Sequence, residues 1–280
     1  MIRPLAGAAL ALAAGGAALT AVGGPAQAAA PAGKVDFAGT VALDNCSGSL
    51  VRGPRTADRD KALVLTNGHC LETGMPGAGE VIVDRPSTRT FTLLDPSGRR
   101  QLGTLRATRI EYATMTDTDV TVYRLSSTYA DIRRKYGISA LRLSPARPKA
   151  GTQIRVVSGY WKKIYSCKID GFVHRMREAD WTWKDSIRYT PECETIGGTS
   201  GSPIVDARSR QVVGVNNTGN ESGERCTLNN PCEVGRDGRV TVRKGTNYGQ
   251  QTYLLARCLG ARSDVVLDAR CALPRPAATR

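Results

Sequence analysis

The chain has 280 residues and carries 39 Lys and Arg against 25 Asp and Glu, which gives a formal net charge of +14. This length suits one large domain or two small ones and is enough to bury a sizeable core. The basic residues are dispersed in short clusters with little aromatic interleaving and without a nucleic-acid-binding motif, which argues against nucleic acid as a partner. We expect a solvated cationic surface, with an anionic polymer such as one of the cell wall as a partner.

Residues 1–28 are predicted to be a secretory signal peptide. Arg3 precedes an apolar region, and Ala26-Gln27-Ala28 is a small-x-small cleavage site. The alternative, a membrane anchor, is disfavoured because the apolar region is short and rich in Ala and Gly. No later stretch is apolar enough to span a bilayer. We therefore expect a secreted, extracellular protein without membrane contact once the signal is removed.

The rest of the chain has the composition of an all-β protein. It combines many glycines with runs of Val, Thr and Ile, and it shows no long apolar repeat of helical spacing. Short apolar runs separated by turn signals are typical of a sandwich or a barrel. The predicted strands lie, in chain order, within residues 38–44, 62–66, 81–83, 91–94, 120–125, 151–160, 203–206 and 211–216.

A charged segment, residues 126–149, separates the first five predicted strands from the last three. We therefore divide the chain after the signal into residues 29–130 and 131–280. Residues 173–183 are polar and aromatic without a clear period, and we interpret them as a surface loop. The tail from Cys258 onward follows all of the predicted strands, and the sequence assigns it no role.

The cysteines indicate a disulfide framework. All eight follow the signal, so they face an oxidising compartment, and their even number leaves none over. A zinc site is disfavoured because no pair of CxxC spacings appears and the chain has only two histidines. Eight cysteines allow 105 pairings. We predict three pairs by proximity in the sequence: Cys167 with Cys193, Cys226 with Cys232, and Cys258 with Cys271.

Residues 196–205, IGGTSGSPIV, predict a tight glycine-rich loop that presents the hydroxyl of Ser200 and leads into a buried strand. A serine is a poor nucleophile without a base. Of the two histidines, His69 follows an apolar run and directly precedes Cys70, whereas His174 has no such setting. Asp119 stands at the head of an alternating strand-like segment.

Four sequence blocks, taken in chain order, resemble those of the chymotrypsin-type (trypsin-like) serine proteases. They cover a small part of the chain, and their specificity comes from occurring together. The Gly-x-Ser-Gly-Ser-Pro loop is more similar to the bacterial glutamyl endopeptidase branch. The blocks are residues 46–51, 65–70, 119–125 and 198–203.

The resemblance implies an all-β fold of two six-stranded Greek-key β-barrels with the active site in the cleft between them. His69 and Asp119 then belong to the N-terminal barrel, and Ser200 belongs to the C-terminal barrel with its disulfide-stapled tail. The resemblance also implies a disulfide between Cys46 and Cys70, which would pin the histidine loop to the neighbouring strand.

The implied mechanism is acyl transfer. Ser200 attacks the scissile carbonyl, His69 moves the proton, and Asp119 holds the imidazole in the required tautomer. The backbone N–H groups of Gly198 and Ser200 form the oxyanion hole. Asp117 is a rival to Asp119, since both lie on the same face of an extended strand; we prefer Asp119 because the apolar alternation begins directly after it.

For substrate binding, the resemblance places Asn217, Thr218 and Gly219 along the primary pocket. Tyr248 and Gly249 are expected on its far wall. A further interpretation puts Glu194 at the pocket base, where its charge would favour Lys or Arg. The sequence itself does not decide between this preference and one for glutamate.

The sequence lacks the family's usual activation device, in which a newly cut N-terminal amine pairs with an aspartate just before the nucleophile. Thr199 occupies that aspartate's position, and the connector after the signal is too short for a folded pro-domain. We predict that the protein is active soon after export; full activity appearing only after a further N-terminal cut would refute this.

The sequence thus predicts a secreted monomeric serine endopeptidase that acts on polypeptide substrates and needs neither cofactor nor metal. The alternative from another class is a catalytically silent protease homologue that acts as a cationic binding module at the cell surface. An esterase acting on small acyl substrates would use the same residues.

Overall fold

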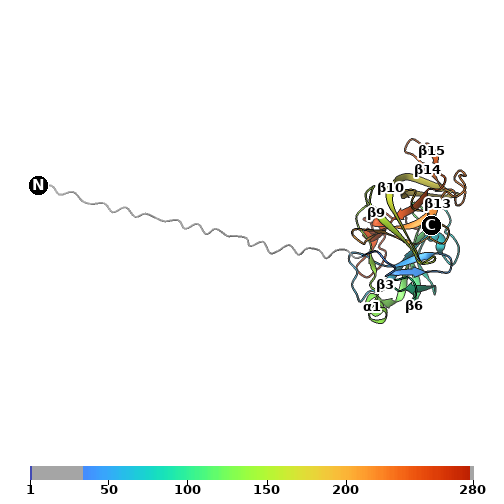
Figure 1. Cartoon of the computed structure of the whole chain (residues 1–280). Coiled ribbons are helices and arrows are strands. Elements are labelled where there is room, and N and C mark those ends of the chain that lie inside the picture. The colour runs from blue at the N-terminus through green and yellow to red at the C-terminus, as the bar shows by residue number, and fades with distance from the viewer. Residues whose placement is uncertain (2–33, 278–280) are drawn as a thin grey trace. The chain divides into compact units, whose positions relative to one another are not determined.

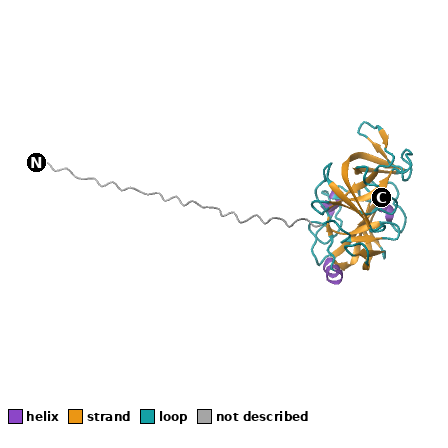
Figure 2. Ribbon diagram, viewed as in Figure 1, coloured by secondary structure: helices purple, strands orange, loops and turns teal. Residues whose placement is uncertain are grey.

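A computed structural model describes Met1 and residues 34–277. The predicted signal peptide beyond Met1, including its cleavage site, lies outside the described residues. The chain divides into the units Met1–Pro31 and Ala32–Arg280, and the folded elements all belong to the second unit (Figure 1). Strands make up 45% of the structure and helices 7%, so the all-β prediction is confirmed (Figure 2).

The first barrel is a closed ring of six strands in the order β1-β5-β6-β7-β3-β2, and the pairing of β1 with β2 closes it. Two short strands are attached outside the ring, β4 to β6 and β8 in parallel to β2. The bounds are β1 Thr40–Ala42, β2 Ser47–Arg52, β3 Lys61–Thr66, β4 Val81–Pro86, β5 Thr90–Leu94, β6 Gln101–Thr114, β7 Val120–Thr128 and β8 Leu141–Arg142.

The second barrel repeats this arrangement in the order β11-β16-β13-β12-β9-β10, and β10–β11 pairing closes the ring. A short hairpin of β14 and β15 extends from β10, at the opposite end of the unit from helix α1 (Tyr129–Tyr136) (Figure 1). The bounds are β9 Gln153–Ser158, β10 Lys163–Glu178, β11 Trp181–Tyr189, β12 Pro203–Asp206, β13 Val212–Gly219, β14 Cys232–Val234, β15 Val240–Val242 and β16 Asn247–Gln251.

Both barrels have Greek-key topology. In the first, β1, β2 and β3 are consecutive antiparallel neighbours, and β5 returns to lie beside β1. In the second, β9, β10 and β11 are consecutive neighbours, and β12 returns to lie beside β9. This is the 4-1-2-3 spatial order of a Greek key. The prediction of two six-stranded Greek-key barrels is confirmed.

The segment between the barrels contains α1 (Tyr129–Tyr136) and β8. Thr128 caps α1 by accepting a hydrogen bond from the Asp131 N–H, and the Asp131 carboxylate bonds back to the Thr128 N–H, which is a capping box. Gly137 ends the helix at φ 70°, a conformation that glycine adopts without strain. The chain then forms β8, which pairs with β2 in parallel, and β9 follows as the first strand of the second barrel.

An apolar core joins the two barrels. Val51 and Leu63 of the first barrel and Val205 of the second belong to one buried cluster. The C-terminal helix α2 (Tyr253–Cys258) contributes Leu255 to the same cluster. Because this cluster spans the junction, it fixes the two barrels against each other.

The segment after α2, residues 259–277, is called the tail strap here because it runs back to the first barrel. Leu259 and Leu273 are buried in the cluster that joins the barrels. The Tyr112 hydroxyl of β6 donates a hydrogen bond to the Pro274 carbonyl at 3.0 Å, and Arg124 of β7 pairs with Asp264. The tail that sequence reasoning left without a role therefore packs against the N-terminal barrel.

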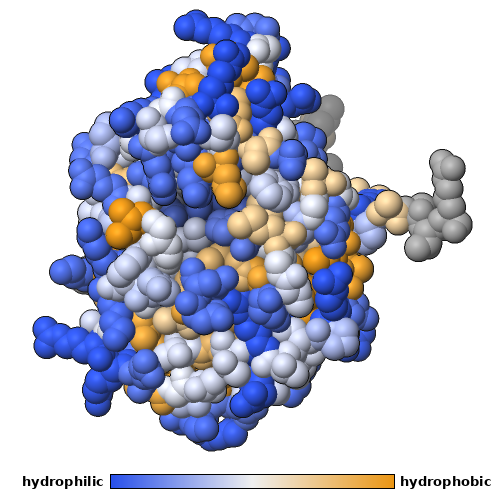
Figure 3. Space-filling view, turned by 90° about the vertical axis from the view of Figure 1, so that its right-hand side faces the viewer, coloured by the Kyte–Doolittle hydropathy of each residue, from blue (hydrophilic) through white to orange (hydrophobic). Residues whose placement is uncertain are grey.

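All four predicted disulfides are present in the structure: Cys46–Cys70, Cys167–Cys193, Cys226–Cys232 and Cys258–Cys271. Hydrophilic residues predominate on the face in Figure 3, where apolar residues form separate patches. Among the described residues, no helix combines the length and hydrophobicity needed to cross a bilayer.

The prediction of a surface loop over residues 173–183 is wrong. These residues form the end of β10, a tight turn and the start of β11. The buried positions do not alternate regularly, since Val173 is buried as well as Met176 and Glu178, and the register shifts between Ile169 and Gly171. The shift and the inward carboxylate hide the period of two that would reveal the strand.

Candidate active site

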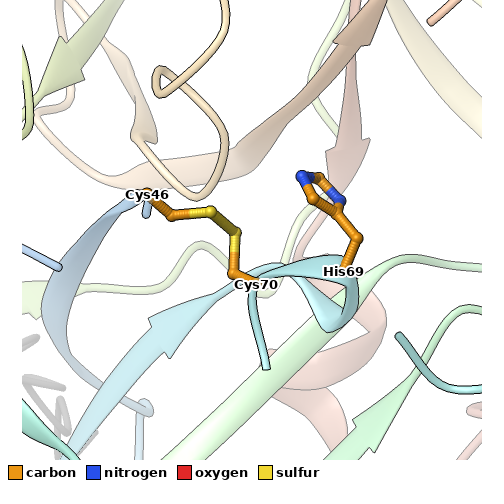
Figure 4. Close-up of side chains that lie close together, drawn as sticks. All are labelled: Cys46, His69 and Cys70. Carbon is orange, nitrogen blue, oxygen red and sulfur yellow. A yellow bond between two sulfur atoms is a disulfide. The ribbon is translucent and has the colours of Figure 1, made fainter. Parts of the chain in front are cut away.

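His69 lies in a short 3₁₀ turn, Gly68–Cys70, that directly follows β3. The Cys46–Cys70 disulfide ties this turn to the start of β2, and Figure 4 shows the disulfide beside the histidine side chain. The imidazole is about four-fifths buried, since its side chain is 19% exposed. The turn thus holds the ring in a fixed position at the edge of the first barrel.

Asp119 precedes β7 and is completely buried. One carboxylate oxygen accepts the N–H groups of Gly68 at 2.5 Å and His69 at 3.2 Å, and the other lies 2.7 Å from His69 Nδ1. Because a carboxylate only accepts, Nδ1 carries the proton and Nε2 of the neutral ring is left as the acceptor. This is the tautomer that a general base requires.

Asp117, the alternative considered from the sequence, has a different environment. It adopts φ 60°, and its carboxylate lies 2.6 Å from Lys184 Nζ at a half-exposed position. The carboxylate that contacts His69 is therefore that of Asp119.

The surroundings of His69 raise its pKa. Burial acts to lower the pKa, but the charge and hydrogen bond of Asp119 and the charge of Glu178 outweigh it. The imidazole therefore takes up a proton more readily than an isolated histidine, as suits a group that must become an imidazolium during a reaction.

Ser200 lies in a loop whose glycines have conformations that other residues avoid. Gly198 and Gly201 have φ of 83° and 79°. A Cβ on Gly201 would lie 2.0 Å from the Ser47 carbonyl oxygen, so no larger residue fits. The Ser200 hydroxyl donates to the Asn217 carbonyl at 3.1 Å.

Two backbone N–H groups beside Ser200 are oriented by the loop. The Gly197 carbonyl accepts the Trp161 indole N–H at 2.6 Å, and the Thr199 carbonyl accepts the Ser202 N–H at 3.1 Å. In a trans peptide the N–H points opposite to the C=O, so the Gly198 and Ser200 N–H groups point away from these partners. Neither N–H has a hydrogen-bond partner in the part of the chain that the structure describes.

Asn67 connects the histidine loop, the aspartate and the serine loop. Its side-chain amide donates to the Asp119 carbonyl at 2.8 Å, and its side-chain oxygen accepts the Gly201 N–H at 2.5 Å. The residue is fully buried. Sequence reasoning missed this bridge because both contacts depend on how distant segments pack, although Asn67 lies only two residues before His69.

One pocket brings most of the candidate residues together. His69, Ser200, Asn217, Thr218 and Gly219 all line it, as the resemblance implied for the last three. The other lining residues are Met75, Met115, Glu178, Trp181, Trp183, Thr195, Ile196, Gly197, Asn216, Glu221, Leu228, Asn229 and Asn247.

Three predicted residues lie elsewhere. Glu194 is exposed and does not line the pocket, because the turn after Cys193 directs it outward. Tyr248 and Gly249 are buried inside the second barrel, and the preceding residue of β16, Asn247, lines the pocket in their place. The second histidine, His174, lies on β10 and is not a lining residue.

A metal site is not supported at the histidine. Cys46, His69 and Cys70 have potential ligand atoms within 4.8 Å of one another. Both sulfur atoms, however, form the disulfide, so neither is the thiolate that a metal ion would need.

Residues 46–215 match the family model of the trypsin-like peptidase domain. The chain belongs to this family. No curated protein matches this trypsin-like peptidase closely enough to count as a relative. The narrower resemblance to glutamyl endopeptidases stays a prediction.

Several solved structures are similar to this trypsin-like peptidase. The MamO protease domain from Magnetospirillum magneticum is 12% identical, with 79% of this chain and 95% of that chain covered and a TM-score of 0.48. The active form of the Rv3671c protease from M. tuberculosis is 15% identical, with 87% and 84% covered and a TM-score of 0.48. The Nocardiopsis protease is 14% identical, with 78% and 92% covered and a TM-score of 0.43.

Proposed function

We propose that this trypsin-like peptidase is a secreted serine endopeptidase that hydrolyses peptide bonds through an acyl-enzyme on Ser200. One observation carries the proposal: the imidazole of His69, paired with a buried carboxylate, lines the same pocket as the Ser200 hydroxyl. Serine, base and orienting acid are the three groups that this chemistry requires.

The first step needs a rotation of the Ser200 side chain, because its hydroxyl donates to the Asn217 carbonyl in this conformation. Because both side chains line one pocket, we infer that rotation about χ1 turns the hydroxyl from that carbonyl towards Nε2 of His69. His69 then takes the proton as the oxygen attacks the scissile carbonyl, and Asp119 stabilises the resulting imidazolium.

The backbone N–H groups of Gly198 and Ser200 receive the oxyanion that forms. Each such donor typically contributes about 3 kcal/mol to lowering the barrier. His69 next delivers its proton to the leaving amine, and water releases the acyl group by the reverse sequence. All groups come from the chain itself, so we infer no cofactor.

Secretion is supported by the predicted signal peptide and by the four disulfides, which persist in oxidising compartments. We infer that the protein works outside the cell as a monomer on polypeptide substrates. The net positive charge supports an anionic cell-wall polymer as the surface near which it acts.

The test is covalent labelling of the exported protein with a sulfonyl fluoride or an organophosphonate, followed by mass measurement. We expect one adduct that disappears in Ser200→Ala and persists in Ser202→Ala, which changes a buried serine of the same loop. No adduct between mildly acidic and mildly alkaline pH would favour the silent binding module instead.

Peptide digestion separates an endopeptidase from an esterase. We expect internal cleavage of a peptide library by the same sample, and activity on small esters alone would favour the esterase. The N-terminus of the exported protein, read by mass spectrometry, is expected at Ala29. Full activity without further trimming would agree with the predicted lack of a zymogen switch.

A further inference from the structure

The turn between β10 and β11 is held at the edge of the active-site pocket by contacts with other segments. The Trp181 indole N–H donates to the Pro76 carbonyl of the first barrel at 2.9 Å. On the opposite side, the Ala179 N–H donates to the Cys226 carbonyl at 2.8 Å, in the loop closed by Cys226–Cys232. The turn is therefore fixed between the first barrel and a disulfide-closed loop.

Glu178 is the last residue of β10 and faces the pocket from this turn. It is 4% exposed. Its Oε1 accepts the Asn229 N–H at 2.8 Å. Its Oε2 is buried and has no hydrogen-bond partner of normal geometry among the described residues, although the Thr218 hydroxyl lies nearby. No Lys or Arg of the described chain forms an ion pair with this carboxylate. Burying an ionised carboxylate without a counter-charge costs free energy, so a cationic partner reaching this carboxylate would stabilise its ionised form.

A second residue that lines the pocket also has buried polar atoms without hydrogen-bond partners in the described chain. Asn217 is 3% exposed, and both polar atoms of its side chain are buried without partners in the described chain. The ionisable lining residues are His69, Glu178 and Glu221, with no Lys or Arg among them. The pocket is therefore locally acidic in a protein whose net charge is +14.

We propose that Glu178 forms an acidic subsite that binds the Lys or Arg side chain of a polypeptide substrate near the bond attacked by Ser200. This proposal rests on the proposed endopeptidase function and names its substrate class. The residue is a specificity determinant and takes no part in bond cleavage.

The chemistry of the site favours a cationic side chain. The free Oε2 is a hydrogen-bond acceptor, and an ammonium or guanidinium group supplies both the donor and the opposite charge. Burial raises the pKa of Glu178, although the Asn229 N–H, the nearby Thr218 hydroxyl and the charge of His69 act in the opposite direction. A bound cation stabilises the ionised form that this environment disfavours.

The position at the pocket supports recognition close to the reacting bond. Glu178 and Ser200 line the same pocket. The negative charge of Glu178 also acts to raise the pKa of His69. The rim of this pocket carries the exposed apolar side chains of Met75, Ile196 and Leu228. Such a rim excludes water from around the stem of a long basic side chain.

The test compares wild type and Glu178→Gln on a peptide library. Wild type is expected to prefer Lys or Arg at one position by kcat/KM, and the variant is expected to lose at least about 30-fold of that preference, as for removing one partner of a buried charge pair. Turnover of peptides that are neutral at this position is expected to persist. Glu192→Gln, which changes an exposed carboxylate outside the pocket lining, is the matched control.

Binding of p-aminobenzamidine by calorimetry gives a readout that does not need catalysis. We expect wild type and Ser200→Ala to bind it, uncharged benzamide to bind more weakly, and Glu178→Gln to bind it about 30-fold more weakly. If wild type neither cleaves peptides nor reacts with the phosphonate, the proposed function fails, and the amidine result still decides the subsite.

Two outcomes would overturn the acidic subsite. One is a folded Glu178→Gln that keeps the basic preference and the amidine affinity. The other is loss of the preference in Glu194→Gln but not in Glu178→Gln, which would support the residue expected from the sequence. If Glu178→Gln does not fold, Glu178→Asp is used, which keeps the charge with a shorter reach; unchanged amidine affinity there would also count against the proposal.

Discussion

At the scale of single residues, the site depends on a few side chains that connect otherwise separate segments. Asn67 is the clearest example, because it binds the backbone of both Asp119 and Gly201 from inside the protein. Its side-chain amide therefore fixes Asp119 of the first barrel relative to the loop that carries Ser200. The local geometry of the site is thus set by hydrogen bonds that cross between barrels.

Asn67→Ala is expected to leave the Asp119 carbonyl without its Asn67 partner, whereas the Gly201 N–H keeps only its bond to the Asn216 carbonyl at 3.0 Å. We expect a loss of about 1–3 kcal/mol in the free energy of unfolding, measured by denaturant titration. Thr104→Ala, at an exposed position of β6, is the control and should change stability by less than about 0.5 kcal/mol. A stability unchanged from wild type would show that the bridge contributes nothing.

The pH dependence of activity follows from the raised pKa of His69. A general base works only when it is neutral, so kcat/KM should rise with pH as His69 loses its proton, with the midpoint above the usual value of 6.5. Glu178→Gln removes one negative charge that favours the imidazolium, and the acid limb should move to lower pH. A midpoint at or below 6.5 in wild type contradicts the expected influence of Asp119 and Glu178.

The sequence revealed those candidate catalytic residues that lie within short local motifs. His69, Asp119 and Ser200 each lie in a recognisable motif, and the structure brings His69 and Asp119 into contact and His69 and Ser200 into one pocket. Glu178 and Asn67 escaped notice because their partners are set by strand pairing over long distances. Glu194 illustrates the reverse error, since proximity to Ser200 in sequence did not bring its side chain into the pocket.

At the scale of elements, two hairpin turns of the second barrel support the site. The β10–β11 turn carries Glu178, and the β9–β10 turn carries Tyr160 and Trp161, which would contact a Cβ on Gly198. The period of β10 is masked by a bulge and by inward charged and thioether side chains, so its second half could not be identified as a strand from the sequence. The strands nearest the motifs were predictable because their apolar runs are unbroken.

Trp161→Phe tests the support from the β9–β10 turn. The variant lacks the indole N–H that holds the Gly197 carbonyl, so the Gly198 N–H is free to turn away from the oxyanion. We expect kcat to fall about tenfold with little change in KM, because a less well-oriented donor chiefly affects the transition state. Tyr160→Phe is the control, and an equal effect of both variants would point to general loosening of the turn.

At the scale of the whole molecule, the tail strap and the shared core hold two barrels that each carry part of the site. The sequence predicted both barrels and the four disulfides, since those follow from composition, spacing and the family resemblance. It did not predict where the tail packs, because its few apolar residues have no period. That position depends on a cluster assembled from both barrels.

Replacing Cys258 and Cys271 by alanine together is expected to destabilise the fold by about 3 kcal/mol, in line with a closed loop of this size. The measurement is denaturant unfolding followed in parallel with activity. If stability is unchanged, the strap is held by its packing in the shared cluster and its polar contacts with β6 and β7, without help from the disulfide. Tyr112→Phe, which removes only the bond to Pro274, should cost about 1 kcal/mol.

The strap also bears on when the protein can first act during its own synthesis. Residues near Leu273 complete the junction between the barrels, yet they are made after everything else in that junction. A chain still being translated or exported therefore holds the histidine, the aspartate and the serine without the contacts that lock them together. If the proposed endopeptidase function holds, we expect hydrolysis to begin only once the residues near Leu273 have been synthesised and have packed into the junction.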